Sequence, residues 1–354
     1  MIYILGLCFI LFLSLIKHNK RNDKIFMIVT ALVCLLIMGL RSSSVGTDST
    51  MYFELYNLEI SGSTTALTEK APLYIFILKN VTAFFPNWNQ IYFFFTALIV
   101  ITFVWCAIAL VNIPCREAII MYYLLFFLDS LNGTRTYVAA SLVFFAFALT
   151  LSKYKCKMIF ASFIIMAATF IHNVALSGFI IIAMELLDLS DKKIRRVVIG
   201  IMALSCLLIT PAISIFIRFF PVYSGTLQRV TDTVGASAII FQVIFIACVF
   251  EVIYCLKCGK DYNPLIDKKS FDILSVLSIT ELIFYIAGGT LWYIQRILIF
   301  MEMPVLLIYP VLSKINCRYR KLFKSIVWIV ALFVFFYRIF RNLGNVRPYK
   351  FYWQ

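Results

Sequence analysis

The sequence contains few charged residues and almost no histidine. Only 14% of its 354 residues are Asp, Glu, Lys or Arg and only 2 are His, whereas 63% are hydrophobic. Its mean hydropathy of +0.95 lies far above that of ordinary soluble chains. A soluble globule cannot hide so much apolar surface from water. The composition therefore excludes a soluble enzyme, a disordered tail and a disulfide-stapled scaffold, and it indicates an integral membrane protein.

Acidic residues are the scarcer of the two charged kinds. Lys and Arg number 32 against 17 Asp and Glu, which gives a formal charge of +15. A basic surface can bind nucleic acid, but these charges form short clusters between apolar runs and do not follow one helix face. We therefore interpret them as signals of membrane topology and expect no nucleic-acid partner.

Familiar catalytic and ligand-binding motifs are missing as well. The sequence has no glycine-rich phosphate loop, no G-x-S-x-G and no H-E-x-x-H. Its 10 cysteines fall inside apolar runs or beside basic clusters, a distribution typical of reduced thiols. Cys255 and Cys258 form a single C-x-x-C without further ligands, so we predict neither a metal site nor a cofactor. Function must come from the few polar residues in apolar surroundings.

Apolar segments of nearly bilayer-spanning length recur along the whole chain. A span takes about 20 apolar residues, and fewer where flanking Lys or Arg can reach the headgroups. The segments lie at residues 1–16, 25–40, 91–111, 117–131, 136–151, 155–171, 173–188, 197–213, 238–256, 271–288, 292–312 and 325–340. We predict an all-α, polytopic integral membrane protein with about twelve transmembrane helices, in a range of about 10 to 13. It forms a single membrane domain over residues 1–354, and the chain turns near His172 between two thin spans.

A further apolar stretch at 71–85 is short and carries Lys79 in its interior. The positive-inside rule decides whether it crosses the membrane. If it does not cross, the basic loop at 17–24 and every later major basic cluster lie in the cytoplasm, whereas a full crossing puts the later clusters outside. We therefore predict a long external loop at 41–90 with a re-entrant or interfacial helix at 71–85. The basic C-terminal tail at 341–350 is the exception, because it also falls outside.

This topology places a set of polar residues at the outer membrane face. They are Arg41, Asp48, Glu69, Arg135, His172 and Arg296. Three guanidinium groups near the headgroups suit a diphosphate, because Arg binds phosphate oxygens bidentately and keeps its charge. A His or carboxylate beside them could take a proton from a hydroxyl. The set fits metal-independent glycosyl transfer from a lipid diphosphate, in which Arg stabilises the charge that develops on the leaving group.

These residues also have ordinary structural explanations. A single Arg near a helix end can reach the interface at a modest cost. Gly46 and Asp48 can form a turn that caps a following helix, and His172 can cap a hairpin. If the segment after Gly46 is helical, Asp48 and Tyr52 share one face, and both could bind a sugar. His172 is the stronger candidate base, since the only other histidine, His18, lies in a basic loop.

Five short motifs stand out along the chain. The first and most specific is R-S-S-S-V-G-T-D-S-T-M-Y, which runs from Arg41 to Tyr52. The others are E-K-A-P-L-Y from Glu69, N-G-T-R-T-Y-V-A-A-S from Asn132, I-H-N-V-A-L from Ile171 and Y-I-Q-R from Tyr293. In type and order they resemble the motifs of the EpsG family of Wzy-type polysaccharide polymerases, and they span most of the chain.

The resemblance implies a glycosyltransferase with a GT-C-like architecture that polymerises oligosaccharide repeat units carried on undecaprenyl diphosphate. Its active face would be the outer side of the bacterial inner membrane, and its product would be capsule, exopolysaccharide or O-antigen. Its partners would be the lipid-linked oligosaccharide, membrane lipid, a flippase and a chain-length regulator. Thr136 departs from the family, which often has Gln after the central Arg.

The motif matches carry over onto individual positions of this chain. Arg41 and Asp48 match the first motif, and Glu69, Arg135, His172 and Arg296 match the second to the fifth in that order. Their roles are our inference from chemistry. We expect the three arginines to bind diphosphate, Tyr52 to bind sugar, and His172, Asp48 or Glu69 to act as the base.

Three other functions stay open on the sequence. A lipid-linked oligosaccharide flippase would share the basic charge and the many spans, but its arginines should line a cavity at mid-membrane. A membrane O-acetyltransferase could use His172, but it should draw its acyl donor from the cytoplasm. An ion-coupled transporter would rely on Glu251, Glu281 and Glu302, which fall inside predicted spans.

Overall fold

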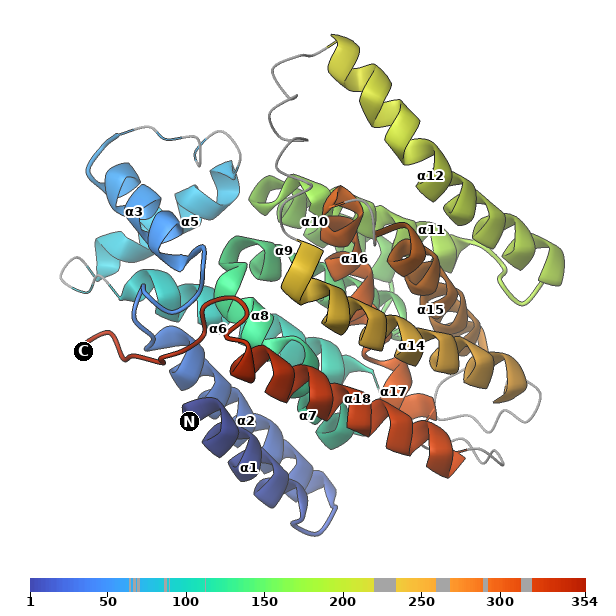
Figure 1. Cartoon of the computed structure of the whole chain (residues 1–354), viewed down its shortest axis with the longest axis horizontal. Helices are drawn as coiled ribbons and strands as arrows, with labels where there is room; N and C mark the ends of the chain where they lie inside the picture. Colours follow the sequence, from blue (N-terminus) through green and yellow to red (C-terminus); the bar gives the residue numbers. More distant parts are fainter. Residues whose placement is uncertain are drawn as a thin grey trace. The chain divides into compact units, whose positions relative to one another are not determined.

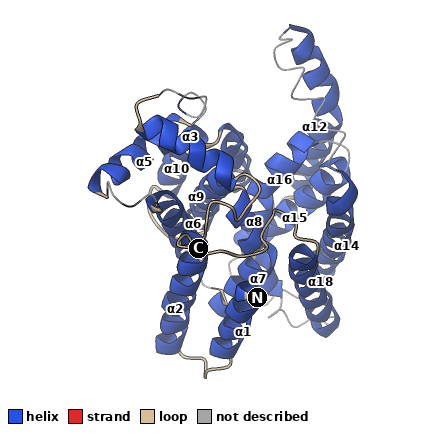
Figure 2. Cartoon of the chain, turned by 60° about the vertical axis from the view of Figure 1, so that its left-hand side comes forward, coloured by secondary structure: helices blue, strands red, loops and turns tan. Residues whose placement is uncertain are grey.

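The described part of the chain is built from helices. A computed structural model describes residues 1–63, 65, 68, 71–85, 88, 90–111, 113–219, 234–258, 268–288, 292–312 and 320–354. Over these ranges it contains α-helices, one 3-10 helix and loops, and the single β-bridge joins Arg41 to Phe351 (Figure 2). The predicted all-α class is therefore confirmed.

Internal contacts divide the chain into two compact units. The first combines Met1–Ile182 with Arg338–Gln354, and the second is Ala183–Tyr337. Figure 1 labels their helices. The first unit holds α1 (Ile2–Ser14), α2 (Lys20–Gly39), α3 (Ser49–Ile60), α5 (Pro72–Phe84), α6 (Ile91–Leu110), α7 (Cys115–Leu125), α8 (Phe127–Asn132), α9 (Thr134–Thr150), α10 (Lys157–Ile171) and the 3-10 helix η1 (Asn173–Gly178). The second holds α12 (Lys192–Phe219), α14 (Val234–Cys258), α15 (Lys268–Gly288), α16 (Trp292–Val305) and α17 (Ile308–Leu312), while α11 (Phe179–Leu186) and α18 (Arg320–Phe340) cross the boundary.

A helix lies at every predicted span and at the 71–85 stretch. Within the described ranges, four helices are long and apolar enough to cross a membrane: Lys20–Gly39, Ile91–Leu110, Lys268–Ala287 and Arg320–Phe340. Several shorter apolar helices accompany them, among them α1, α9 and α10. The chain is thus a multi-pass membrane protein, whereas its total of about twelve crossings stays a prediction.

Helix α9 forms the centre of the first unit. It packs against α6 on one side and α10 on another. Its contact surfaces are rich in small residues, because Ala139, Ala140, Ser141, Ala146 and Ala148 are all fully buried. Small side chains let helix backbones approach closely in lipid, where burying apolar surface gives little driving force between helices. The packing around α9 fixes where the helix begins, and Arg135 lies in its first turn.

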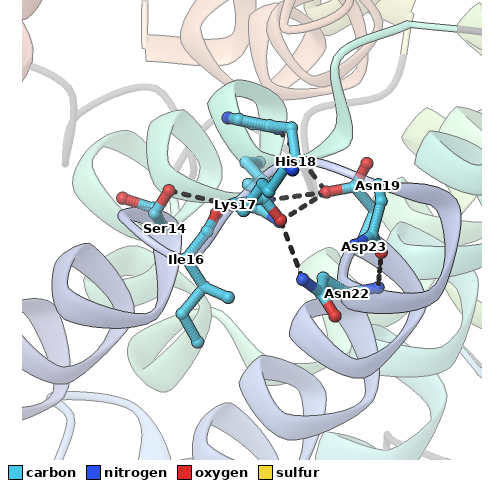
Figure 3. Close-up of polar contacts among 8 residues, drawn as sticks. Ser14, Ile16, Lys17, His18, Asn19, Asn22 and Asp23 are labelled. Atoms are coloured by element: carbon cyan, nitrogen blue, oxygen red, sulfur yellow. Dashed lines mark hydrogen bonds and ion pairs between the residues drawn. The ribbon is translucent and has the colours of Figure 1, made fainter.

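Arg116, a buried arginine of α7, holds the loop between α1 and α2 through several polar contacts. Figure 3 shows the polar contacts of this loop. Arg116 is only 3% exposed, and its guanidinium pairs with Asp23 at 2.7 Å and donates to the Ser14 carbonyl at 2.9 Å. It also donates to the carbonyls of Ile16 and Lys17. Because the basic side chains of the loop itself are exposed, they can act as topology signals, whereas Arg116 holds the turn.

Helices α3 and α5 are joined by an ion pair between a buried Glu59 and an exposed Lys79, within the predicted external loop. Glu59 on α3 is 1% exposed, and its carboxylate lies 2.9 Å from Nζ of Lys79 on α5. Thr65 donates to the same carboxylate from its backbone N–H at 2.8 Å and its hydroxyl at 2.6 Å, and Thr68 donates from its hydroxyl. Burial raises the pKa of Glu59, but these donors and Lys79 outweigh burial and hold the pKa at about 2. Lys79 therefore has a charged partner inside the loop.

Candidate functional site

The first and third sequence motifs interlock at the junction of α8 and α9. The backbone N–H of Asp48 donates to the side-chain oxygen of Asn132 at 3.0 Å. The Ser49 hydroxyl donates to the carbonyl oxygen of Leu131 at 3.2 Å. Gly46 has φ +104° and lies so close that a Cβ there would come 2.7 Å from the same carbonyl. Two motifs far apart in the sequence therefore form one structure.

Arg41 lies at the centre of this structure and is completely buried. One end of its guanidinium donates to the Met38 carbonyl, and the other donates to Leu131 O at 3.0 Å and to the Thr134 hydroxyl at 3.4 Å. The guanidinium carbon lies 4.5 Å from the centre of the Phe93 ring. Burial lowers the pKa of Arg41 to about 10, which still leaves it charged at neutral pH. Arg41 ties the end of α2 to the start of α9.

Arg135 lies one residue beyond the Thr134 that Arg41 contacts, so the structure brings these two predicted arginines together. Arg135 is half-buried, and its guanidinium carbon lies 5.7 Å from the ring centre of Tyr52 on α3. Among the described residues, its buried Nε–H has no hydrogen-bond partner. A buried donor without a partner is costly, whereas an anion at the N-terminal turn of a helix would satisfy it. The Nε–H of Arg41 also lacks a partner, but Arg41 is completely buried with both terminal nitrogens bonded, so the half-buried Arg135 is better placed to meet a ligand.

Asp48 and Tyr52 lie on either side of the start of α3. Asp48 is the residue that precedes the helix, and both side chains are half-buried. The segment after Gly46 is thus helical, which is the condition that the sequence sets for Asp48 and Tyr52 to share a face. Arg135 of the third motif lies against the ring of Tyr52 of the first motif, so the two motifs also meet through these side chains.

The C-terminal tail packs along the first motif through its backbone, a contact that no sequence signal predicts. Ser42 N–H donates to Lys350 O at 2.8 Å, and Tyr352 N–H donates to Leu40 O at 3.0 Å. Farther along, the N–H groups of residues 46 and 47 donate to the carbonyls of residues 345 and 344, each at 3.0 Å. The basic tail lies beside the loop predicted to be external, which is the side that the topology assigns to it.

His172 lies where α10 ends and the chain turns into η1, as the sequence predicts. Its backbone is extended, its N–H donates to Ala168 O at 2.8 Å, and its carbonyl accepts from Ala175 N–H at 2.9 Å. The side chain is 4% exposed, so the imidazole is enclosed within the first unit. Arg296 is exposed on α16 in the second unit, and Glu69 lies outside the described residues.

The three carboxyl groups of the transporter hypothesis gather among α14, α15 and α16 of the second unit. Glu251 and Glu281 are buried, and Glu302 is half-buried. Glu251 accepts a hydrogen bond from the Ser278 hydroxyl, and Glu302 accepts one from the Tyr285 hydroxyl. Glu251 and Glu302 are thus hydrogen-bonded by neutral hydroxyls of a neighbouring helix.

Comparison with known proteins identifies one family. The model of the EpsG family matches residues 24–351, which include the interlocked motifs, His172, Arg296 and most of the C-terminal tail. No curated protein and no solved structure matches the chain. The family match covers nearly the whole chain.

Proposed function

Because the chain belongs to the EpsG family of membrane proteins of polysaccharide biosynthesis, we propose that it is a polysaccharide polymerase. In this proposal it joins oligosaccharide repeat units that are carried on undecaprenyl diphosphate, and it acts at the outer face of the bacterial inner membrane. The product is a capsule, an exopolysaccharide or an O-antigen. Coupling to a flippase and a chain-length regulator belongs to the same proposal.

The reaction is a glycosyl transfer. A hydroxyl oxygen of the acceptor unit attacks the anomeric carbon of the donor unit, and the bond from that carbon to the diphosphate oxygen breaks. The bonding electrons stay on the diphosphate, whose negative charge grows, and the hydroxyl proton passes to a base. Preorganised cations at the diphosphate stabilise that charge as it develops. Arginine suits this task because it stays charged and binds phosphate oxygens with two parallel N–H groups.

The observation that carries the proposal is the unused donor of Arg135. Its buried Nε–H has no hydrogen-bond partner among the described residues, and it lies in the first turn of α9. That turn also presents backbone N–H groups, which favour an anion. The Nε–H of Arg41 also lacks a partner, but Arg41 is completely buried and both of its terminal nitrogens are hydrogen-bonded, so Arg41 positions the turn on which Arg135 lies. Arg296 lies in the second unit, so its role as a diphosphate ligand stays a prediction of the sequence.

The proton acceptor is chosen among His172, Asp48 and Glu69. His172 is 4% exposed, and a neutral imidazole is the form that a base requires. Asp48 lies next to the interlocked motifs, where Tyr52 could hold a sugar ring. Substituting each of the three separately and measuring polymer length identifies the base as the position whose loss stops synthesis while the protein stays folded.

The test is made in cells that lack the gene and express variants of the chain. We expect Arg135→Ala to abolish long polymer while single repeat units still reach the cell surface, because transfer fails after export. Arg135→Lys keeps the charge but loses the bidentate geometry, so it should give short polymer in reduced amount. Arg341→Ala is the matched control, since Arg341 is exposed in the tail of the same unit. Repeat units that accumulate only in the cytoplasmic leaflet would contradict the proposal and indicate a flippase.

A further inference from the structure

A cavity of about 400 Å³ lies beside the loop that follows α2. Four aromatic residues line it: Phe53, Trp88, Phe93 and Tyr352. Its polar lining comes from the Gln90 amide and from the hydroxyl groups of Ser42 and Ser43. All of these residues belong to the first unit, and none carries a formal charge. Over the residues that the structure describes, the lining is therefore aromatic and hydrogen-bonding but not ionic.

This cavity shares its wall with the arginine core of the interlocked motifs. Phe93, which lines the cavity, is also the ring against which the Arg41 guanidinium packs at 4.5 Å. The Gln90 side chain donates to the carbonyls of Gly39 at 2.9 Å and Arg41 at 2.6 Å, which fixes the orientation of its amide. Phe53 stacks on Phe93 with 5.5 Å between ring centres. The wall is thus preorganised by contacts that are already present without a ligand.

Segments far apart in the sequence combine to form the cavity. The loop after α2 supplies Ser42 and Ser43, α3 supplies Phe53, and the start of α6 supplies Phe93. Tyr352 of the C-terminal tail also lines the cavity, and its backbone N–H donates to the Leu40 carbonyl. The side chain of Tyr352 is 46% exposed, so it borders the cavity from its outer side. The tail therefore contributes a side chain to the site.

We infer that this cavity binds an uncharged sugar of the polysaccharide repeat unit. Sugar rings have apolar C–H faces, which pack on aromatic rings, and hydroxyl groups, which bond to amides and hydroxyls. A cavity of a few hundred Å³ with aromatic walls and a few fixed polar groups is typical of a small-ligand site. Among its described lining residues there is no cation for a phosphate, whereas Arg135 at the start of α9 offers one. The inference rests on the proposed function and assigns the sugar and the diphosphate to different side chains.

The test measures binding of lipid-free repeat-unit oligosaccharide, released from the polymer, to the full-length purified protein. Calorimetry or ligand-observed NMR reports the dissociation constant. We expect Trp88→Ala and Tyr352→Ala to weaken binding about tenfold or more, since aromatic anchors dominate such sites. Tyr154→Ala is the matched control, because Tyr154 is 63% exposed and does not line the cavity. Ser43→Tyr should block binding by filling the space without removing any packed side chain.

The sugar site and the polymerase can fail separately. We expect Arg341→Ala, the exposed control of the polymer test, to bind the free oligosaccharide as wild type does. If the wild-type protein binds no oligosaccharide, or if Tyr352→Ala and Ser43→Tyr both bind it unchanged, the sugar site is wrong. If binding depends on the cavity but the purified protein makes no polymer from lipid-linked units, the sugar site stands and the polymerase proposal falls.

Discussion

The close approach at Gly46 gives the sharpest test of how the two motifs are held together. We predict that Gly46→Ala separates them. Gly46 has φ +104°, a conformation that residues with a Cβ rarely adopt, and its Cβ would come 2.7 Å from Leu131 O and also meet the Ser49 hydroxyl. Gly62 is the matched control, since it has φ +93° but no atom within 4 Å of an added Cβ. The two variants share the backbone strain and differ only in the clash.

The expected losses of unfolding free energy follow from the backbone strain and from the clash. The backbone strain should cost about 1–2 kcal/mol in both variants. In Gly46→Ala the loop around residue 46 must also move away from Leu131. This movement weakens the hydrogen bonds from Asp48 to Asn132 and from Ser49 to Leu131, and the loss of each costs about 0.5–1.5 kcal/mol. Gly46→Ala should therefore lose about 1–3 kcal/mol more than Gly62→Ala.

Thermal unfolding of the purified protein measures the difference. A thiol-reactive dye reports unfolding, because Cys34 inside α2 is completely buried in the folded chain. We expect Gly46→Ala to lower the melting temperature clearly more than Gly62→Ala and to reduce polymer synthesis as well. Equal melting temperatures for the two variants would refute the close approach between the first motif and Leu131.

The remaining predictions concern two ion pairs elsewhere in the first unit. Arg116→Lys removes the forked contacts to Asp23 and the loop carbonyls, so hydrogen exchange at residues 15–19 should speed up about tenfold or more, whereas Arg21→Lys should leave it unchanged. Because the folded pKa of Glu59 lies near 2, below its ordinary value of 4.5, the stability from the Glu59–Lys79 pair is complete above about pH 4.5 and is lost as the pH falls toward 2. Limited acid proteolysis of the segment that connects α3 to α5 should follow that window in the wild type, and Glu59→Gln should be cleaved readily throughout; identical cleavage of the two proteins would contradict the pairing.

Apolar run length predicts the helices well because lipid and the protein interior both select continuous apolar segments. The predicted 91–111 and 71–85 correspond to Ile91–Leu110 and Pro72–Phe84. Boundaries differ where polar residues extend a helix into water: the predicted 25–40 is Lys20–Gly39, because Asn19 caps the helix by accepting from Asn22 N–H at 2.7 Å. The polar sequence of α3 carries no such run, so only the structure establishes that helix.

The two arginines of the candidate site show that residue type alone does not predict which side chain can contact a ligand. Arg41 and Arg135 look equivalent in the sequence, and each has a buried Nε–H without a partner among the described residues, yet Arg41 is completely buried with both terminal nitrogens bonded, whereas Arg135 is half-buried. The distinction depends on the carbonyl of Leu131, which lies 90 residues from Arg41. Backbone groups have no sequence signature, so this contact and the docking of the C-terminal tail could not be derived beforehand. Asn132 lies inside a recognised motif, but its role as the acceptor for Asp48 N–H emerges only from the fold.

The central claim is that the chain joins lipid-linked repeat units and that Arg135 binds the leaving diphosphate. Purified protein in lipid vesicles, supplied only with repeat units on undecaprenyl diphosphate, measures this directly. We predict that the wild type releases one undecaprenyl diphosphate for each linkage formed, and that Arg135→Ala forms polymer at least about a hundredfold more slowly. A wild-type protein that makes no polymer from these units would contradict the polymerase function. An Arg135→Ala protein that makes polymer at the wild-type rate would contradict the role of Arg135.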